Sequence, residues 1–146
     1  MLNNNLNSIF TLSEIDKVFN LLVSTNTELK ECFDNYLLKE YPTHTTERLY
    51  YVDCGLISRF IVDKIKSNQT DSLKDFFIKV EQVLLSCTEE IENLIVVGLF
   101  EGIQNIGGRE INYYFGFDQW LLPISKKKWD DLIDSWEGSS WRKNKL

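Results

Sequence analysis

The residues that could do chemistry in this sequence are one histidine, three cysteines and two groups of acids. A Ser-His-Asp or Cys-His mechanism would need His44, the only histidine. It follows Pro42 closely and precedes two threonines, which is typical of a solvated turn before a helix. Cys32, Cys54 and Cys87 are scattered, so neither a disulfide framework nor a zinc site is predicted. We expect them to be reduced residues of the core.

Three acids near the middle of the chain, Glu89, Glu90 and Glu92, could serve as metal ligands or as an acid–base pair. Acids in the first turn of a helix favour the positive end of the helix dipole, and we interpret this group in that way. Gly107 and Gly108 follow the same predicted helix, whereas a phosphate-binding glycine loop precedes one. Neither feature therefore predicts a cofactor site.

A second group of acids lies just after a run of lysines. The run is Lys126–Lys128, and the acids are Asp130, Asp131 and Asp134. Residues four apart are neighbours on a helix, so we expect ion pairs on a solvated face of mixed charge. The sequence thus predicts no catalytic residue, no metal and no cofactor, and we expect a protein that is not an enzyme.

The formal net charge of −6 is confined to one part of the 146-residue chain. Residues 81–120 contain one base, Arg109, and seven acids, while the rest of the chain holds 15 acids and 15 bases. The seven acids are Glu81, Glu89, Glu90, Glu92, Glu101, Glu110 and Asp118. An acidic surface disfavours nucleic acids and anionic membranes as partners and favours a basic protein.

Helical periodicity predicts an all-α protein. With 43% hydrophobic residues, the chain suits one domain, residues 1–146, built as an irregular bundle of about six helices. Leu49, Val52, Leu56 and Phe60 form one such apolar stripe, and Ile57 and Ile61 of the same predicted helix are also apolar. Six helices are predicted. The first starts after the N-cap Ser13, the second covers 27–40, and the third runs from Thr45 or Thr46 to Lys66. The fourth runs from Thr70 or Asp71 through Leu84, the fifth covers 88–106, and the last runs from the cap Ser125 to Gly138.

The helix predicted over 88–106 should organise the fold. Residues 94–100 are apolar without a break, so we expect this helix to be covered on every side. Ser86 with Glu89 fits the capping-box spacing, Thr88 is a second possible cap, and Gly107-Gly108 ends the helix. Gly98 and Gly102 share a face, where we expect close approach of a neighbouring backbone or a large ring.

The segments around these helices carry further expectations. Residues 1–11 are rich in asparagine and should be frayed, 109–117 should form an ordered aromatic loop, and 139–146 a short basic tail. Trp136 and Trp141 should close the core, with an exposed Trp141 as an alternative binding anchor. The start of the chain lacks the features of a signal peptide, and no apolar run could span a bilayer, so we expect a cytoplasmic protein.

Several C-terminal segments carry a family resemblance. They are the helix 89–105, the aromatic loop, Leu122-Pro123-Ile124-Ser125, and the closing helix 128–136 with Trp129 and Trp136. Together they resemble small helical bacterial proteins, several of which are immunity proteins of polymorphic-toxin or contact-dependent growth inhibition systems. The resemblance implies a protein without catalytic residues that blocks the active site of a cognate toxin domain, often a basic nuclease.

Two functional hypotheses therefore remain besides the disfavoured enzyme. The first is an immunity protein, monomeric or weakly dimeric, that docks acids on a basic toxin. The second is a small regulatory or scaffold module that has no toxin partner. For the first, we expect binding residues where acids have no neighbouring bases in the sequence, namely at Glu89, Glu92, Glu101, Glu110 and Asp118.

Overall fold

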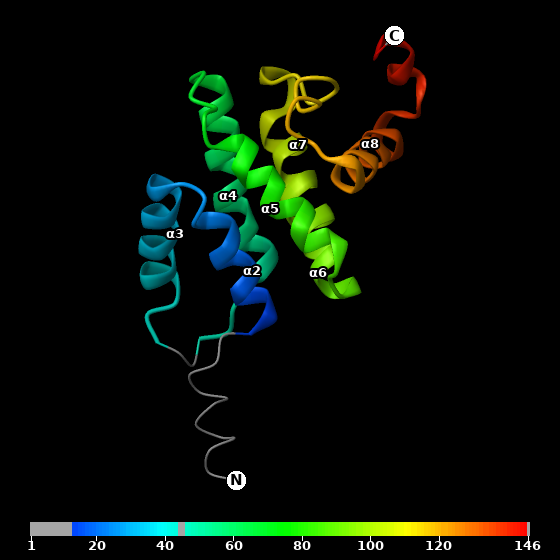
Figure 1. Cartoon of the computed structure of the whole chain (residues 1–146). Coiled ribbons are helices and arrows are strands. Elements are labelled where there is room, and N and C mark those ends of the chain that lie inside the picture. Colours follow the sequence, from blue (N-terminus) through cyan, green and yellow to red (C-terminus); the bar gives the residue numbers. More distant parts are fainter. Residues whose placement is uncertain (1–12, 44–45, 146) are drawn as a thin grey trace.

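The computed structural model of the chain describes residues 13–43 and 46–145, and every regular element in these ranges is a helix (Figure 1). The predicted all-α class and the bundle of about six helices are confirmed. Five of the helices are α2 (Glu14–Val23), α3 (Thr27–Glu40), α4 (Tyr50–Lys66), α5 (Leu73–Leu85) and α8 (Pro123–Glu137). The sixth, which we call the central helix, consists of three consecutive elements: α6 (Glu89–Asn93), η1 (Leu94–Phe100) and α7 (Glu101–Gly107). The predictions for residues 1–11 and His44 lie outside the described residues.

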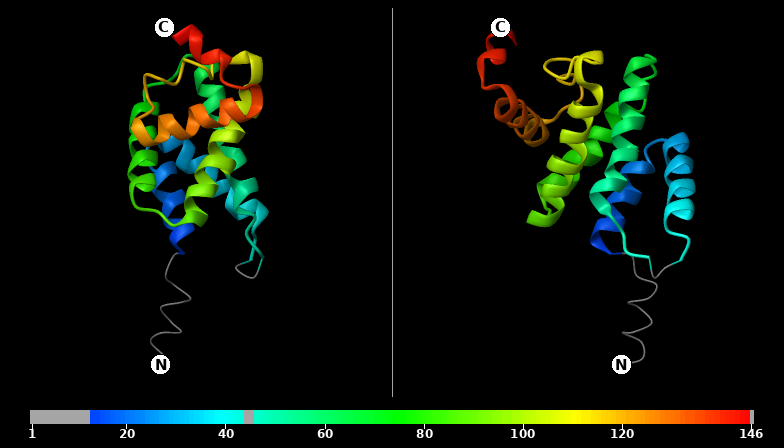
Figure 2. Two further views of the ribbon diagram at one scale, coloured as in Figure 1. Left: turned by 90° about the vertical axis from the view of Figure 1, so that its right-hand side faces the viewer. Right: turned by 180° about the vertical axis from the view of Figure 1, so that it is seen from behind.

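The arrangement is the same in all ribbon views. The central helix and α4 lie between the α2–α3 pair on one side and α8 on the other (Figures 1 and 2). Two short 3-10 turns, η2 (Gly108–Glu110) and η3 (Ser140–Lys145), follow the central helix and α8. The chain therefore builds one bundle in which the central helix touches both α4 and α8.

Helix starts follow side-chain caps at three places. Ser13 accepts a hydrogen bond from the backbone N–H of Asp16, and Asn26 accepts one from Leu29. Thr88 caps the central helix, whereas Ser86 ends α5, so the predicted Ser86 capping box is wrong. α4 begins later than predicted, at Tyr50, since the segment before it is held in a non-helical conformation.

The central helix packs closely against α4 where its glycines lie. A Cβ atom on Gly98 would come within 3.0 Å of the Cys54 sulfur, and one on Gly102 within 2.7 Å of the Ser58 hydroxyl. The predicted close approach is confirmed: Cys54 and Ser58 of α4 lie nearest to the glycines, and the ring of Tyr51 lies beside Gly98. Val97 is 47% exposed, so the helix is not covered on every side.

The middle of the central helix, η1, is π-helical. Such a turn holds one residue more than an α-helical turn, which widens the helix. Leu94, Ile95, Leu99 and Phe100 are all buried there, and the Ser58 hydroxyl of α4 donates a hydrogen bond to the Leu99 carbonyl at 3.1 Å. The wider turn thus accompanies burial against two neighbours, α4 and α8.

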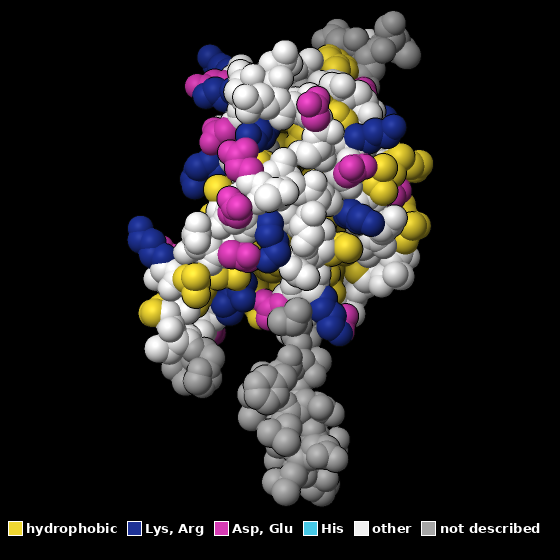
Figure 3. Space-filling view, turned by 60° about the vertical axis from the view of Figure 1, so that its left-hand side comes forward, with side chains coloured by type: hydrophobic (Ala, Val, Ile, Leu, Met, Phe, Trp, Pro, Cys, Tyr) yellow, Lys and Arg dark blue, Asp and Glu magenta, His cyan; other side chains and the backbone are white. Residues whose placement is uncertain are grey.

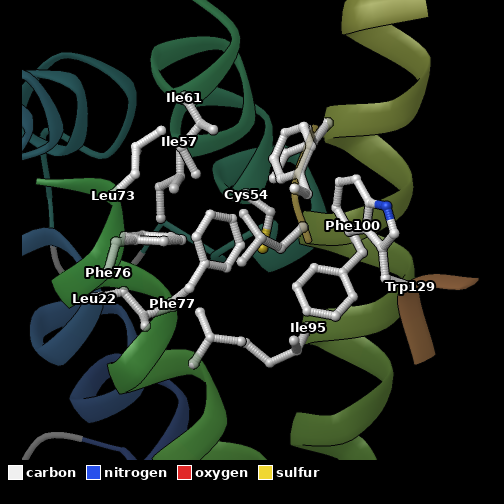
Figure 4. Packing of buried hydrophobic residues seen from close by; sticks show 14 of the residues in the cluster. Leu22, Cys54, Ile57, Ile61, Leu73, Phe76, Phe77, Ile95, Phe100 and Trp129 are labelled. Carbon is white, nitrogen blue, oxygen red and sulfur yellow. The ribbon is translucent and has the colours of Figure 1, made fainter. Parts of the chain in front are cut away.

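Aromatic rings join the central helix to α8 and α5 in the core (Figure 4). Trp129 is fully buried, stacks on Phe117 at 4.4 Å between ring centroids, and meets the edge of Phe100 at 5.3 Å. Phe77 of α5 packs edge-on against Phe117 at 5.9 Å. The predicted aromatic loop is therefore confirmed as an ordered loop whose Phe117 completes the core.

The C-terminal segment is docked on α8. The ring of Trp141 is 8% exposed and its Nε1 donates to the Asp134 carboxylate at 2.8 Å. Arg142 binds the same carboxylate at 2.6 Å. Trp136 is 49% exposed, so the prediction that both tryptophans close the core is wrong for Trp136.

α8 starts at Pro123 rather than at a Ser125 cap, because a carboxylate from α5 binds its first turn. Glu81, buried between α5 and α8, accepts hydrogen bonds from the backbone N–H groups of Ile124 (3.0 Å) and Ser125 (2.8 Å) and from the Ser125 hydroxyl (2.7 Å). Burial acts to raise the pKa of Glu81, but these three donors outweigh it and hold the pKa below its usual value.

This carboxylate makes folding sensitive to acid. Because the folded pKa is lowered, the ionised Glu81 stabilises the fold above the unfolded pKa of about 4.3, and this contribution disappears as the pH falls through the folded pKa. We expect Glu81→Gln to lower the free energy of unfolding at pH 7. Below about pH 4.3, the free energy of unfolding of this variant should decrease less steeply with falling pH than that of the parent. Urea unfolding across pH measures this. An unchanged slope would contradict the assignment; Glu31→Gln, at an exposed site on α3, is the control.

The three free cysteines differ in environment, which corrects the prediction that all lie in the core. Cys32 is exposed, Cys87 is half-buried and Cys54 is buried. Burial, with a smaller effect of Asp53, raises the pKa of Cys54 to about 12. Because the thiolate is the reactive form, a thiol reagent should label Cys32 first and Cys54 last. Cys32→Ser should remove the fast phase of labelling in the native protein, and fast labelling of Cys54 would contradict its packing.

Candidate functional site

Three of the five predicted binding acids have lysine partners. Glu92 pairs with Lys128 of α8 at 2.7 Å, and Asp118 pairs with Lys126 at 2.9 Å. Glu110 pairs with Lys66 of α4. The reasoning that these three acids lack neighbouring bases is therefore wrong, because helix packing brings in lysines that are distant in sequence. Their role in binding stays a prediction.

The other two predicted acids, Glu89 and Glu101, form no ion pair within residues 13–43 and 46–145. Glu89 is exposed at the start of α6, and Glu101 is half-buried at the start of α7. Both lie on the same outward side of the central helix as Val97, four residues before Glu101. Of the predicted site residues, these two keep negative charge that no described base neutralises.

A row of residues four apart connects these two acids along the central helix. We call it the outer stripe: Glu89, Asn93, Val97, Glu101 and Asn105. All are exposed except the half-buried Glu101. A surface with an apolar side chain between two unpaired carboxylates can contact an apolar group and two cations at once. The sequence analysis did not single out Asn93, Val97 and Asn105, although their spacing from Glu89 and Glu101 predicts the row.

The predicted group of acids on α8 is neutralised, as expected. Lys126 pairs with Asp130 at 3.4 Å and Lys127 with Asp131 at 2.8 Å, both four residues apart on α8. Asp134 instead binds Arg142, as described above. Asp130 is only 4% exposed, so the interpretation of this face as fully solvated is wrong for that residue. Lys128, for which no partner four residues on was predicted, binds Glu92 of the central helix.

A buried carboxylate that the sequence analysis missed is Asp53 on α4, which has no exposed surface. One oxygen accepts hydrogen bonds from the hydroxyls of Tyr36 and Tyr41, each at 2.7 Å, and the other accepts one from Arg48 Nε at 3.0 Å. Burial first, and then the hydrogen bond to Asp53, raises the pKa of Tyr36 well above its usual value. An acid within an apolar helical segment was the only signal for it.

The Asp53 cluster holds Tyr41, just after α3, against Arg48 and Leu49, just before α4. Arg48 also pairs with Asp16 of α2 at 2.8 Å, and its guanidinium lies 5.0 Å from the ring centroids of Tyr41 and Tyr50. The Tyr41 hydroxyl accepts a hydrogen bond from the backbone N–H of Leu49 at 3.0 Å. These contacts tie three helices together, and both Asp53 oxygens are already occupied by donors of the same cluster.

Charges of both signs are mixed on the face that Figure 3 shows, where Lys and Arg side chains lie between Asp and Glu side chains. Across residues 13–43 and 46–145, no group of three or more His, Cys, Asp or Glu residues is placed to hold a metal ion. In the same part of the chain, no helix has both the length and the apolar character needed to cross a bilayer. The outer stripe is therefore the feature we take as the candidate site.

Comparison with known proteins identifies a family. Residues 19–137 match the model of a domain of unknown function, DUF7674, which spans from α2 to the last residue of α8 and includes the whole outer stripe. Comparisons with curated proteins and with solved structures found no match. Because the matching segment covers most of the 146 residues, the chain belongs to the DUF7674 family.

Proposed function

We propose that this protein is a non-enzymatic immunity protein of the cytoplasm. It binds a basic toxin domain, such as a nuclease, and blocks the active site of that domain. The observation that carries the proposal is the outer stripe, whose Glu89 and Glu101 lack described ion pairs while Glu92, Glu110 and Asp118 are paired. The resemblance of residues 89–136 to immunity proteins supplies the class of partner. The net charge of −6 agrees with a basic partner.

The stripe suits a cleft that binds phosphates. Two unpaired carboxylates on one helix can occupy positions that a nucleic-acid backbone would take in a basic active site, and they attract that site during encounter. Val97, between them, offers an apolar contact from which water is excluded, where a small number of residues carries most of the binding energy. The three features lie on one continuous helix, so they are held in fixed relative positions.

The second candidate is a regulatory or scaffold module whose partner is not a toxin. The observation that favours it is the half-exposed Trp136, because tryptophan is enriched at protein interfaces. The two candidates differ in the surface used. A toxin inhibitor should depend on the outer stripe, whereas a module of the second kind should depend on Trp136 of α8.

Co-expression with the product of the gene immediately upstream tests the proposal. We expect the protein to restore growth and to co-purify with that product, and the double variant Glu89→Lys/Glu101→Lys to lose both effects. Glu31→Lys, which reverses one exposed acid on α3 that has no described ion pair, is the control and should behave as the parent. Failure of the parent protein to rescue growth or to form a complex would remove the toxin hypothesis and leave the second candidate. Loss of binding with Trp136→Ala, but not with the double variant, would place the toxin-binding surface on α8 instead of the outer stripe.

A further inference from the structure

The residues that follow α8 cover a surface that is both aromatic and acidic. We call residues 138–145 the strap. The ring of Trp141 in the strap lies 5.8 Å from the ring of Tyr114 and 6.0 Å from that of Phe115, centroid to centroid. Its Nε1 donates a hydrogen bond to the carboxylate of Asp134 at 2.8 Å. Trp141 is buried by these contacts, so the strap occupies a preformed place on the bundle.

The next residue of the strap, Arg142, binds the acids of α8. Its Nε lies 3.1 Å from both carboxylate oxygens of Asp134, and one of its terminal nitrogens lies 2.6 Å from one of them. The guanidinium also lies 3.5 Å from Asp131 and 3.7 Å from Asp130. It packs 5.2 Å from the ring centroid of Trp141. The surface therefore binds a ring and a guanidinium in succession, and the carboxylate of Asp134 contacts both.

The strap can leave this surface without disturbing the bundle. Apart from bonds within η3, its described backbone hydrogen bonds join Gly138 to the end of α8 and Arg142 to Ser139. Gly138 has a φ of +75°, which glycine adopts readily, so it is a suitable hinge. The side chains of Asp131 and Asp134 are 52% and 29% exposed, so water and salt compete for the guanidinium. Release thus breaks side-chain contacts at a solvated edge.

The surface beneath the strap is held in shape by contacts that do not involve the strap. The Tyr114 hydroxyl donates a hydrogen bond to Glu137 of α8 at 2.6 Å. Trp129 Nε1 donates one to the backbone carbonyl of Tyr113 at 2.7 Å, which ties the aromatic loop to α8. A surface that is ordered in advance loses little conformational entropy when it binds a ligand.

The strap also lies outside the segment that matches the family. That match ends at residue 137, the last residue of α8, whereas the residues beneath the strap all fall within it. We call these residues the strap site: Tyr114, Phe115, Asp131 and Asp134. The strap site therefore belongs to the DUF7674 domain, and the segment that covers it does not.

We propose that the strap site binds a segment of another protein in which arginine directly follows tryptophan, and that the strap fills the site until such a segment displaces it. The strap itself shows the chemistry of the ligand, since its ring packs on two aromatic rings and its guanidinium binds two carboxylates. Lysine cannot form the forked contact that arginine makes with Asp134. The strap site is separate from the outer stripe, so it acts whichever protein that stripe binds.

NMR spectroscopy of the isotope-labelled full chain tests the site with a capped synthetic peptide that has the sequence of residues 138–143. In the variant Trp141→Ala/Arg142→Ala the strap no longer fills the site. We expect the peptide to cause saturable shifts of the strap-site amides in this variant. The parent should bind the peptide about tenfold more weakly, because its own strap competes at an effective concentration on the order of millimolar.

Three controls show that the site reads the proposed chemistry. Adding Asp134→Asn to the strap variant should weaken peptide binding about tenfold, because this carboxylate binds both side chains. A peptide with lysine in place of arginine should bind several-fold more weakly, at roughly the scale of one lost charged hydrogen bond. Adding Glu31→Gln, at an exposed site on α3, should change nothing. Thermal unfolding confirms that each variant is folded.

Absence of saturable shifts in the folded strap variant would overturn the proposal. So would equal affinity of the parent and the strap variant, or equal affinity for the arginine and lysine peptides. Because these measurements use the chain and a peptide alone, their outcome does not depend on whether a toxin partner is found.

Discussion

Asp53→Ala should cost about 3–5 kcal/mol of the free energy of unfolding, because it leaves a partly buried Arg48 and two tyrosine hydroxyls without their acceptor. The side chain of Arg48 is 21% exposed, so water cannot fully replace the lost carboxylate. Urea unfolding followed by circular dichroism measures the change. We expect the contacts of Tyr41, Arg48 and Leu49 to be lost first.

The matched control for Asp53→Ala is Asp34→Ala on α3. Asp34 pairs with Lys30 four residues earlier, but their side chains are 50% and 40% exposed. Solvent screens such a pair, so its loss should change the free energy of unfolding by no more than about 0.5 kcal/mol. Similar losses for the two variants would show that the Asp53 cluster does not hold α2, α3 and α4 together.

Gly98→Leu should lower the free energy of unfolding by about 1–3 kcal/mol, because the new side chain has no room between the central helix and α4. Its Cβ alone would lie 3.0 Å from the sulfur and 3.3 Å from the Cβ of Cys54, and 3.4 Å from the ring of Tyr51. A helix–helix contact must open to accept the rest of the side chain. A thermal unfolding curve identical to that of the parent would refute the close contact of these helices.

Gly55→Ala provides the comparison for a helical glycine that faces open space. A Cβ there meets no atom within 4 Å, so only the helix propensity changes. We expect a gain of up to about 1 kcal/mol, since alanine restricts the unfolded chain and favours the helix. Opposite signs for the two substitutions would separate the effect of packing from the general cost of glycine in a helix.

Local signals in the sequence were sufficient to predict most helices. The capping residue Ser13 and the end at Gly138 gave correct boundaries, because caps act on neighbouring backbone groups. The stripe of α4 shows where such reasoning stops. α4 has two apolar stripes, and only tertiary packing decides that Ile57 and Ile61 are buried while Val52 faces outward. Periodicity alone cannot choose between them.

The candidate site was only partly predictable, for a related reason. The separation of acids from bases along the chain suggested five binding acids, but Lys66, Lys126 and Lys128 reach three of them in the folded protein. Of these five acids, only Glu89 and Glu101 have no ion pair among the described residues. The Asp53 cluster was not predicted because its donors come from three different segments. The balance of acids and bases along the sequence therefore predicts available binding acids less well than the ion pairs of the folded protein do.

The most direct test of the proposed binding site is the rate of association between the purified protein and the proposed toxin partner at low and moderate salt. We expect Glu101→Lys to slow association about tenfold at low salt and to reduce its salt dependence, because it reverses an unpaired charge in the outer stripe. Glu92→Lys and Asp131→Lys reverse acids that are already paired with lysines, so they should slow association much less. Equal losses for all three variants would show that only the overall charge matters, and a loss confined to Asp131→Lys would place the binding surface on α8 and contradict the account.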